Sequence, residues 1–564
     1  MKKAVKKSLS ELIVSVFVII LAGFILSFTF FQVDLTAEKR YTLSDQSVEI
    51  LDSLNDMVYV KVYLDGDLPP GFERMKRSVK QLLDEFRTYA GKNIQYQFIN
   101  PAATTDTKER DALYKELYDK GLQPTNIQAH DEEGGASQKV IFPGALVVYN
   151  GVELPLNLLE NNPAKSAAVN LNNSIETLEF KFIQAIKNIT SKKVEKIAFI
   201  EGHGELNQYE VGDITKELAN YYQVDRGRIG GLAGSLDDYE AVIIAKPTDK
   251  FPENDKFVLD QYIMHGGRVF WLIDPVSVSM DSLMNGSTMA LIPETGLEDQ
   301  LFRYGVRLNP DLVQDVQCAI IPVNTALAGN PAKFTPAPWL YFPLLSPGEE
   351  HPINKNIPPV KAEFASSIDT VKGGGEVHKT ILLTTSQLSR TLNVPLFINL
   401  DQIHEKPSRA EFNRSHIPVA VLLEGQFESD FKNRILSGLD IRGKYNFKAM
   451  SEPTKMVVVA DGDIIRNDVR NTPNGLAISP LGYDRYSRQT FGNKEFILNV
   501  VNYLTDETGI MKLRAREFTL RLLDKAALKE GKLKWQLINT IVPVLFVILF
   551  GIIVHFFRKR KYSR

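Results

Sequence analysis

The sequence predicts an α/β protein in which two folded domains lie between two membrane-spanning helices. Two long apolar runs lie near the ends of the 564-residue chain. Between them, short β-branched runs alternate with helix-forming stretches, which is typical of sheets covered by helices. The content of 44% hydrophobic and 24% charged residues is that of folded globular domains.

The first apolar run, Leu12 to Phe31, contains no charged residue and is long enough to cross a bilayer as a helix. Four lysines precede it, so the positive-inside rule places residues 1–11 in the cytoplasm. A cleaved signal peptide is the alternative, but its apolar core is shorter and ends at a small-residue cleavage site. No such site follows Phe31, so we expect an uncleaved anchor at 12–31.

The second apolar run, Leu537 to Phe557, follows Trp535, and an indole prefers the membrane interface. Basic residues lie on both sides of this run, so its orientation follows from the first span. We therefore expect residues 558–564 in the cytoplasm and the bulk of the chain in the periplasm, anchored in the inner (plasma) membrane.

Residues 45–165 predict a small α/β domain. The expected elements, in order, are a helix at 45–54 capped by Ser44, a strand at 57–64, a helix at 74–89, a strand at 94–99, a helix at 107–120, and strands at 140–149 and 152–156. Asn150-Gly151 between the last two is a hairpin signal. The order resembles a thioredoxin-like layout, but Cys318 is the one cysteine, which excludes a CxxC redox site and an intrachain disulfide.

Residues 174–505 predict a larger, doubly wound domain with a parallel sheet. A helix at 174–189 should link it to the first domain. The expected strands are 196–200, 241–245, 268–273, 380–384, 418–423 and 456–460, and the expected helices are 209–222, 255–265 and 494–504. An insertion at 322–359 contains nine prolines and several aromatic residues; it is either packed on the domain or an apolar contact surface. Residues 506–534 should form a helical stalk that enters the second span.

Three acidic turns follow predicted strands of the larger domain: Glu201-Gly202-His203-Gly204-Glu205, Asp274-Pro275 and Asp461-Gly462-Asp463. The carboxyl ends of strands are where open α/β sheets bind ligands. If these strands are neighbours, six side chains could converge on a hard cation or a polar ligand: Glu201, His203, Glu205, Asp274, Asp461 and Asp463. The alternative is that they are ordinary turn residues, because Asp and Gly favour turns.

The sequence contains no motif for nucleotide hydrolysis, nucleophilic catalysis or zinc-dependent hydrolysis. The stretch 373–380 (GGGEVHKT) lacks the second glycine of a phosphate loop and precedes a strand, so we expect no ATPase. The chain has no GxSxG or HExxH motif, and Cys318 lies in an apolar stretch. A net charge of −2 does not indicate nucleic-acid binding. We expect no cofactor, no metal centre, no catalytic residue and no enzymatic activity.

Several stretches, in order along the chain, resemble the ABC-transporter auxiliary family, in particular its gliding-motility-associated members. They are 34–44 (DLTAEKRYTLS), 173–179 (NSIETLE), 198–205 (AFIEGHGE), 239–247 (YEAVIIAKP), 457–466 (VVVADGDIIR) and 492–504 (GNKEFILNVVNYL). The resemblance implies a partner permease in the membrane, a separate cytoplasmic ATPase, and a role in gliding motility or related secretion. It also implies a glutamine-amidotransferase-like second domain, in which Gly202-His203 and Asp274-Pro275 stand where active members carry a cysteine elbow.

The resemblance therefore favours a non-enzymatic auxiliary subunit, either substrate-binding-like or a scaffold. Two alternatives remain open at this stage. One is an envelope module that binds a sugar, peptide or cation at the acidic strand ends. The other is a hydrolase that uses His203 and nearby carboxylates on an amidotransferase-like scaffold.

Overall fold

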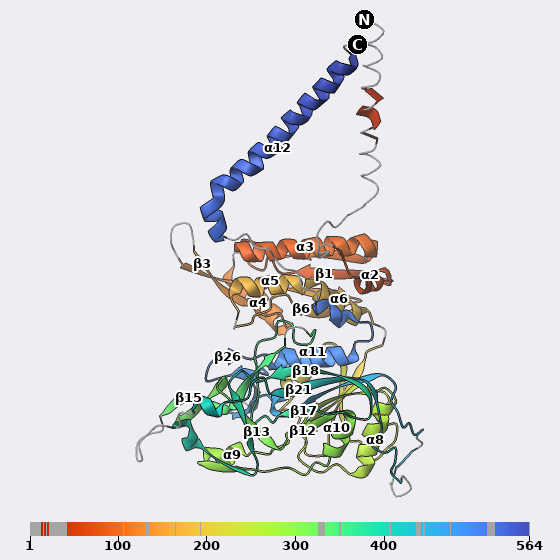
Figure 1. Ribbon diagram of the computed structural model, residues 1–564, viewed down its shortest axis with the longest axis vertical. Coiled ribbons are helices and arrows are strands. Elements are labelled where there is room, and N and C mark those ends of the chain that lie inside the picture. The colour runs from red at the N-terminus through yellow and green to blue at the C-terminus, as the bar shows by residue number, and fades with distance from the viewer. Residues whose placement is uncertain are drawn as a thin grey trace. The chain divides into compact units, whose positions relative to one another are not determined.

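The computed structural model describes fifteen stretches of the chain in two units. The described residues are 13–14, 16–18, 20–21, 42–104, 106–130, 136–163, 165–191, 193–324, 333–348, 351–404, 408–435, 441–443, 446–473, 475–515 and 525–562. The first unit is Met1–Arg516 and the second is Glu517–Arg564. The first contains a small and a large α/β domain (Figure 1).

The small domain is built on a four-stranded mixed sheet with the order β2-β1-β5-β6. Its strands are β1 (Val58–Val62), β2 (Ile94–Phe98), β5 (Gly144–Tyr149) and β6 (Val152–Asn157). β1 pairs parallel with β2 and antiparallel with β5. Asn150 and Gly151 join β5 to β6 with positive φ angles of 49° and 81°, so the predicted hairpin turn is confirmed.

Helices cover both faces of this sheet. They are α2 (Asp45–Asp52), α3 (Pro70–Ala90), α4 (Thr107–Asp119), α5 (Ala167–Glu176) and α6 (Leu178–Thr190), and a hairpin of β3 (Thr125–His130) and β4 (Ala136–Ile141) completes the domain. α3 buries Met75, Val79, Leu83 and Phe86 at helical spacing against the sheet. α4 contributes Leu117 to a cluster on the other face.

The predicted linker helix at 174–189 differs from the structure. The helix is broken at Thr177, and α6 buries Phe182, Ile183 and Ile186 in the core of the small domain. The predicted helix is amphipathic in the structure, but the surface that α6 covers is the sheet of the small domain, chiefly β5 and β6, so the segment belongs to that domain and is not a linker.

Among the described residues, the large domain contains a ten-stranded sheet with the main order β14-β15-β18-β21-β22-β10-β9-β7-β8 and with β16 beside β15. Its strands are β7 (Lys196–Ile200), β8 (Gln223–Gly227), β9 (Ala241–Ala245), β10 (Arg268–Leu272), β14 (Cys318–Asn324), β15 (Phe334–Pro347), β16 (Val360–Lys361), β18 (Gly375–Thr384), β21 (Pro418–Phe427) and β22 (Thr454–Val459). β8, β7, β9, β10 and β22 are parallel.

The other half of this sheet is antiparallel, so the prediction of a parallel, doubly wound sheet is wrong for that half. β22 pairs antiparallel with β21, β21 with β18, and β18 with β15. The six predicted strands are all present, but an apolar β-branched run has the same pattern in either direction.

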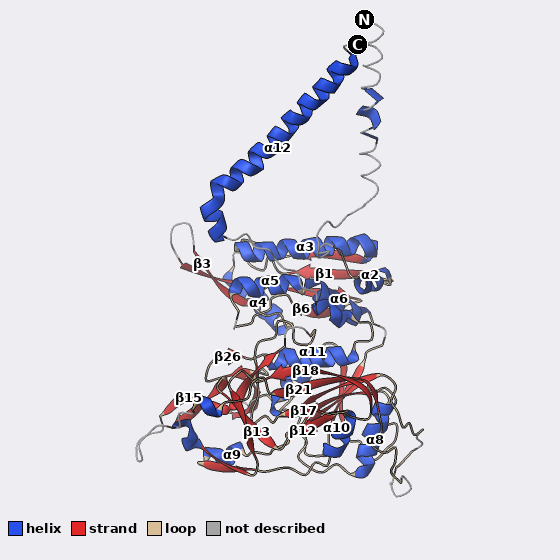
Figure 2. Ribbon diagram, viewed as in Figure 1, coloured by secondary structure: helices blue, strands red, loops and turns tan. Residues whose placement is uncertain are grey.

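Both faces of the parallel half are buried. On β10, Phe270 and Leu272 belong to one apolar cluster, whereas Val269 and Trp271 belong to another. Figure 2 shows α11 on one side of the strands and α8 and α10 on the other. The helices of this domain are α7 (Gly212–Leu218), α8 (Glu253–Met264), α9 (Met280–Met284), α10 (Glu298–Tyr304) and α11 (Asn493–Thr505). Burial on both faces explains why these strands are apolar throughout.

Short two-stranded sheets surround this core. Their pairs are β11 (Ser287–Ala290) with β20 (Leu396–Asn399), β12 (Val306–Leu308) with β17 (Ile368–Thr370), β13 (Asp311–Asp315) with β19 (Ser389–Asn393), β23 (Val469–Thr472) with β24 (Gly475–Ile478), and β25 (Tyr483–Asp484) with β26 (Gln489–Thr490).

The proline-rich insertion at 322–359 is packed on the large domain where it is described. β15 places Trp339 and Tyr341 in a satellite core, where they are 2% and 1% exposed. Phe334, at the start of the same strand, is 59% exposed. Of the two interpretations, the structure therefore supports packing.

The segment expected to be the start of a stalk differs too. The 3₁₀ helix η6 (Ile510–Ala515) buries Ile510, Met511 and Leu513 in the core of the small domain. Residues 510–515 therefore belong to the first unit.

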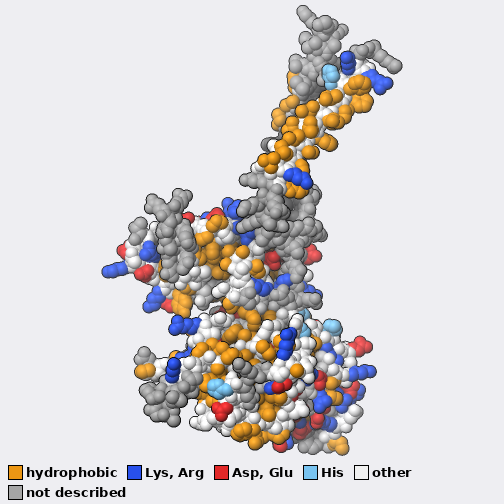
Figure 3. Space-filling model, turned by 60° about the vertical axis from the view of Figure 1, so that its left-hand side comes forward, with side chains coloured by type: hydrophobic (Ala, Val, Ile, Leu, Met, Phe, Trp, Pro, Cys, Tyr) orange, Lys and Arg blue, Asp and Glu red, His pale blue; other side chains and the backbone are white. Residues whose placement is uncertain are grey.

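The second unit contains α12 (Lys525–Tyr562). Residues Leu533–Phe557 of this helix are long and apolar enough to cross a membrane, and they are the one such stretch in the described part of the chain. Figure 3 shows their apolar side chains in orange. Of the first span predicted at 12–31, residues 13–14, 16–18 and 20–21 are helical, and the remainder lies outside the described residues.

Candidate functional site

The carboxyl ends of the parallel strands in the large sheet carry polar turns. Glu201 directly follows β7 and Lys246 directly follows β9, whereas Asp274 and Asp461 each lie two residues beyond the end of their strands, β10 and β22. Because parallel strands end at the same edge of a sheet, these turns are neighbours in the order of their strands. This is the edge at which α/β sheets bind ligands.

Three of the six predicted side chains converge at this edge. Asp274, Asp461 and Asp463 each place a carboxylate oxygen within 4.8 Å of the others. Backbone amides fix them: Asp461 accepts a hydrogen bond of 2.7 Å from the amide of Asp463, and Asp274 accepts one from the amide of Gly462. Carboxylates at this spacing are suitable ligands for a hard cation.

The chain supplies a cation of its own to this cluster. Nζ of Lys246, at the end of β9, lies 2.9 Å from Oδ2 of Asp274 and also pairs with Oδ2 of Asp463. The backbone of Lys246 has a positive φ of 55°, which is uncommon for a residue with a side chain. A divalent ion at the three carboxylates would therefore have to displace the Lys246 ammonium.

Burial and neighbouring charges shift the pKa values of Asp461 and Asp463 in opposite directions. Burial, together with repulsion from Asp463 and Asp274, raises the pKa of Asp461 well above its ordinary value. Burial opposes ionisation of Asp463 too, but the ammonium of Lys246 and the guanidinium of Arg466 outweigh it and lower its pKa. The two cations therefore favour the charged form of Asp463, whereas burial opposes the charge of Asp461 and raises the pKa of Asp274 as well.

His203 and Glu205 form a second, separate cluster. Nδ1 of His203 lies 3.0 Å from Oε1 of Glu205, and Nε2 lies 2.9 Å from Oδ2 of Asp255 at the start of α8. The imidazole stacks on the ring of Phe251 at 3.7 Å between centroids. Gly204 has a φ of 74°, and a Cβ there would lie 2.0 Å from the hydroxyl of Thr248, so the turn requires glycine.

This arrangement makes His203 a buried cation. Burial opposes its charge, but the hydrogen bonds that the ring donates to the carboxylates of Asp255 and Glu205 outweigh burial and raise the pKa of His203 to about 9. Both ring nitrogens have carboxylate partners, and the residue is 3% exposed. His203 and Glu205 are within hydrogen-bond reach of one another, as the catalytic groups of a hydrolase would be. Neither ring nitrogen of His203 is open to a substrate or a nucleophile, however.

Glu201 joins neither cluster. Its Oε1 lies 2.6 Å from Nε of Arg226 on β8, and its side chain is 41% exposed. The six predicted residues therefore divide into three groups along the edge. Whether any of them binds a ligand remains a prediction.

Sequence reasoning missed three charged members of these clusters, Lys246, Arg466 and Asp255. A signal for the first was present, because Lys246-Pro247 follows an apolar strand in the same way as Asp274-Pro275. Asp255 gave no comparable signal, since an acidic residue in the first turn of a helix is ordinary.

Comparison with known proteins bears on both domains. Residues 195–500 match the model of a family described as an ABC-type uncharacterized transport system, and residues 37–148 match a domain of unknown function, DUF7088. A protein of Borreliella burgdorferi described as uncharacterized is 20% identical over 551 residues, which is 95% of each chain.

Two solved structures show weak likeness to this chain. The mmIFT52 N-terminal domain is 12% identical with a TM-score of 0.31, over 55% of this chain and 98% of that one. A protein from Parabacteroides merdae described as ThuA-like is 12% identical with a TM-score of 0.25, over 56% and 90%. Neither likeness bears on function.

Proposed function

The chain belongs to the ABC-type uncharacterized transport system family, and from this premise we propose that it is a non-enzymatic auxiliary subunit that binds a membrane permease. Through that permease it would act with a separate cytoplasmic ATPase. The observation that carries the proposal is the family match, which spans residues 195–500 and therefore the whole parallel half of the large sheet.

We propose further that the transporter serves gliding motility or related secretion, as the resemblance to the gliding-motility-associated protein GldG suggests. The support is the set of stretches quoted above, including 198–205 (AFIEGHGE) and 457–466 (VVVADGDIIR). These two stretches build the turns after β7 and β22, so the resemblance lies in the part of the fold where the polar clusters form.

The proposal of a non-enzymatic role rests on the state of those clusters. The imidazole of His203 is held between two carboxylates, and the ammonium of Lys246 between two others. Each cation is neutralised by its neighbours and is fixed in position. Such groups stabilise turns, whereas a catalytic base or nucleophile needs a free lone pair directed at the substrate.

Within the first unit, η6 contacts elements of both the large and the small domain. Nη1 of Arg514 lies 2.6 Å from Oδ1 of Asn499 on α11, and Nη2 donates a hydrogen bond of 2.9 Å to the carbonyl of Lys355. Its guanidinium also lies over the ring of Phe180 on α6, 5.3 Å from the centroid. One short segment thus holds the large and the small domain together.

This segment precedes α12 in the sequence, with residues 517–524 between the first unit and that helix. We propose that α12 and a first span at 12–31 hold the chain at the membrane, with both termini in the cytoplasm. Asn539 and Pro543 lie within the apolar stretch and are candidates for packing against the permease.

Co-purification tests this proposal. The full chain, extracted from its native membrane in a mild detergent, should elute with a polytopic membrane protein and an ATPase, which mass spectrometry identifies. A variant in which 533–557 is replaced by an unrelated spanning sequence should lose the permease and keep its unfolding temperature. Elution of the native chain alone would overturn the proposal.

A further inference from the structure

The small domain contains a pocket at the carboxyl ends of its two parallel strands. The cavity measures about 260 Å³ and is lined by three segments that are distant in the sequence. Residues 63–68 follow β1, residues 100–102 follow β2, and residues 139–142 belong to the end of β4 and the turn after it. The pocket therefore has the position that α/β sheets use for ligands, in a different domain from the clusters described above.

Close packing fixes the walls of this pocket. Gly66 has a φ of 103°, and a Cβ there would lie 2.8 Å from Nδ2 of Asn100, so the first two segments meet at a glycine. Asn100 in turn accepts a hydrogen bond of 2.9 Å from the amide of Ala102. A ligand would therefore find the first two segments already in place, which reduces the entropy lost on binding.

Charges of both signs face the pocket. Oδ1 of Asp65 lies 2.7 Å from Nζ of Lys76 on α3, and that hydrogen bond lowers the pKa of Asp65, so the group is a carboxylate. Nζ of Lys139 lies 2.9 Å from Oδ2 of Asp67 and also contacts the carbonyl of Asp67.

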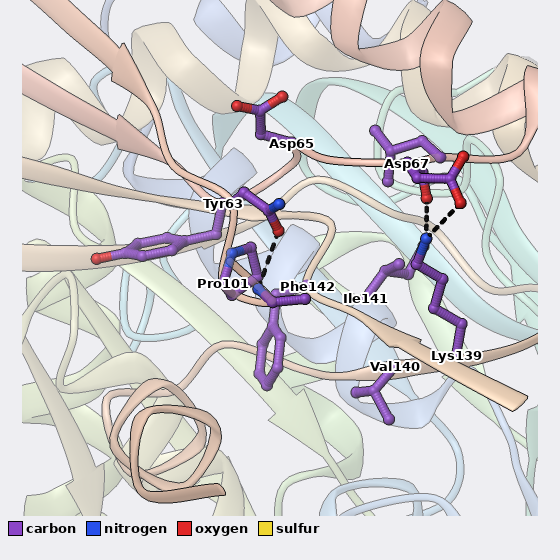
Figure 4. A pocket seen from close by; sticks show the side chains of 11 residues that line it. Tyr63, Asp65, Asp67, Pro101, Lys139, Val140, Ile141 and Phe142 are labelled. Atoms are coloured by element: carbon purple, nitrogen blue, oxygen red, sulfur yellow. Dashed lines mark hydrogen bonds and ion pairs between the residues drawn. The ribbon is translucent and has the colours of Figure 1, made fainter. Parts of the chain in front are cut away.

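The pair of Asp67 and Lys139 can open. The carboxylate of Asp67 is fully exposed and Lys139 is 30% exposed, and an ion pair this exposed contributes little to stability. Figure 4 shows the two side chains meeting at one side of the pocket, with the ring of Phe142 directed away from them. Phe142 and Tyr63 instead belong to the buried cluster on that face of the sheet.

We propose that this pocket binds a zwitterionic ligand of the size of an amino acid or a dipeptide. The ligand carboxylate would replace Asp67 as the partner of Lys139, and the ligand ammonium would pair with Asp67. Each charge of the protein would keep a partner, so that opening the pair leaves no charge uncompensated. This inference goes beyond the proposed function and does not depend on a partner permease.

Isothermal titration of the full chain in detergent tests the inference, with L-alanine, L-leucine and L-alanyl-L-alanine as probes. At least one should bind saturably at one site per chain. Its methyl ester lacks the carboxylate and its N-acetyl form lacks the ammonium, and each should bind about two- to fivefold more weakly, which corresponds to the loss of one exposed ion pair. Lys139→Gln should weaken binding of the zwitterion by a similar factor but leave the affinity for the methyl ester unchanged. Asp67→Asn should leave the affinity for the N-acetyl form unchanged.

Lys61→Gln is the matched control. Lys61 lies in the same domain, is 32% exposed and pairs with Glu153 at 2.8 Å, so it resembles Lys139 in exposure and in having a carboxylate partner, but it does not line the pocket. Binding by this variant should equal that of the unaltered chain. The inference is overturned if none of the three probes binds saturably, or if Lys139→Gln and Asp67→Asn bind the zwitterion as tightly as Lys61→Gln does.

Discussion

Nε2 of His203 lies 2.9 Å from Oδ2 of Asp255, and the two residues are 52 positions apart in the sequence. The contact joins the turn after β7 to the first turn of α8. With Glu205 on the other ring nitrogen, it makes a buried ion triplet from a motif that resembles a catalytic turn.

Replacement of His203 by Gln should make the stability of the chain less dependent on pH. The pKa of His203 is raised from 6.5 to about 9 in the folded protein, so its contribution is fully present below pH 6.5 and is lost as the pH rises through 9. The shift corresponds to about 3 kcal/mol. The stability difference between the native chain and His203→Gln should therefore shrink by about that amount between pH 6 and pH 10, measured by unfolding in detergent.

His265→Gln is a suitable control for this experiment, because His265 lies at the carboxyl end of α8 and its Nδ1 contacts the carbonyl of Gln261. Its stability difference from the native chain should not follow the same curve. If the difference for His203→Gln stays constant from pH 6 to pH 10, His203 is not a cation in the folded protein.

Replacement of Lys246 by Met should destabilise the chain and create a cation site. Removing the ammonium leaves buried carboxylates without their partner, which costs about 3–5 kcal/mol. Asp274, Asp461 and Asp463 would then face an open position with oxygen ligands suited to calcium. Millimolar calcium chloride should raise the unfolding temperature of Lys246→Met and leave that of the native chain unchanged.

A second substitution separates these two effects. Lys246→Met combined with Asp274→Asn replaces one unpaired carboxylate with a neutral amide, which is a weaker calcium ligand, so the double variant should be more stable without calcium and less responsive to it. Potassium chloride at equal ionic strength controls for screening. A calcium response of the same size in the native chain would show that Lys246 does not occupy the cation position.

The strands and the β5–β6 hairpin could be predicted because their signals are local. Ala241–Ala245 is apolar throughout because both of its faces are buried, and Asn150-Gly151 adopts the positive φ angles that such a turn requires. The burial of Trp339 could not be predicted, since an aromatic residue among prolines has no periodicity that distinguishes a core from a surface.

The ion triplet and the Lys246 cluster depend on which strands are neighbours. The predicted convergence of Asp274 with Asp461 and Asp463 assumes that β10 lies beside β22, which is the case. Glu201 was expected in the same group, but β9 and β10 separate β7 from β22. Strand order arises from packing of the whole sheet, and no local pattern encodes it.

Replacement of Arg514 by Leu should loosen the two domains from one another. The change removes hydrogen bonds of 2.6 Å to Asn499 and 2.9 Å to the carbonyl of Lys355, and it takes this donor away from Oδ1 of the buried Asn499. The expected loss of stability is about 2–4 kcal/mol. Limited proteolysis should cut the variant faster between the domains, near residues 191–195.

Lys512→Leu controls for this effect, because Lys512 lies in the same 3₁₀ helix but its side chain is exposed. Its digestion should match that of the native chain. Equal digestion of Arg514→Leu and Lys512→Leu would contradict the proposal that η6 couples the domains.

Replacement of Trp339 by Ala should destabilise the large domain far more than the same change at Phe334. Both residues lie on β15 in the proline-rich insertion, but Trp339 is 2% exposed and Phe334 is 59% exposed. Truncation of a buried tryptophan costs about 3–5 kcal/mol, whereas an exposed site usually changes stability by about 0.5 kcal/mol or less. Thermal unfolding of the two variants in detergent measures the difference. If both variants lose little stability, β15 does not pack as a core strand. If Phe334→Ala loses permease binding but keeps its stability, the exposed ring of Phe334 is part of the contact with the partner.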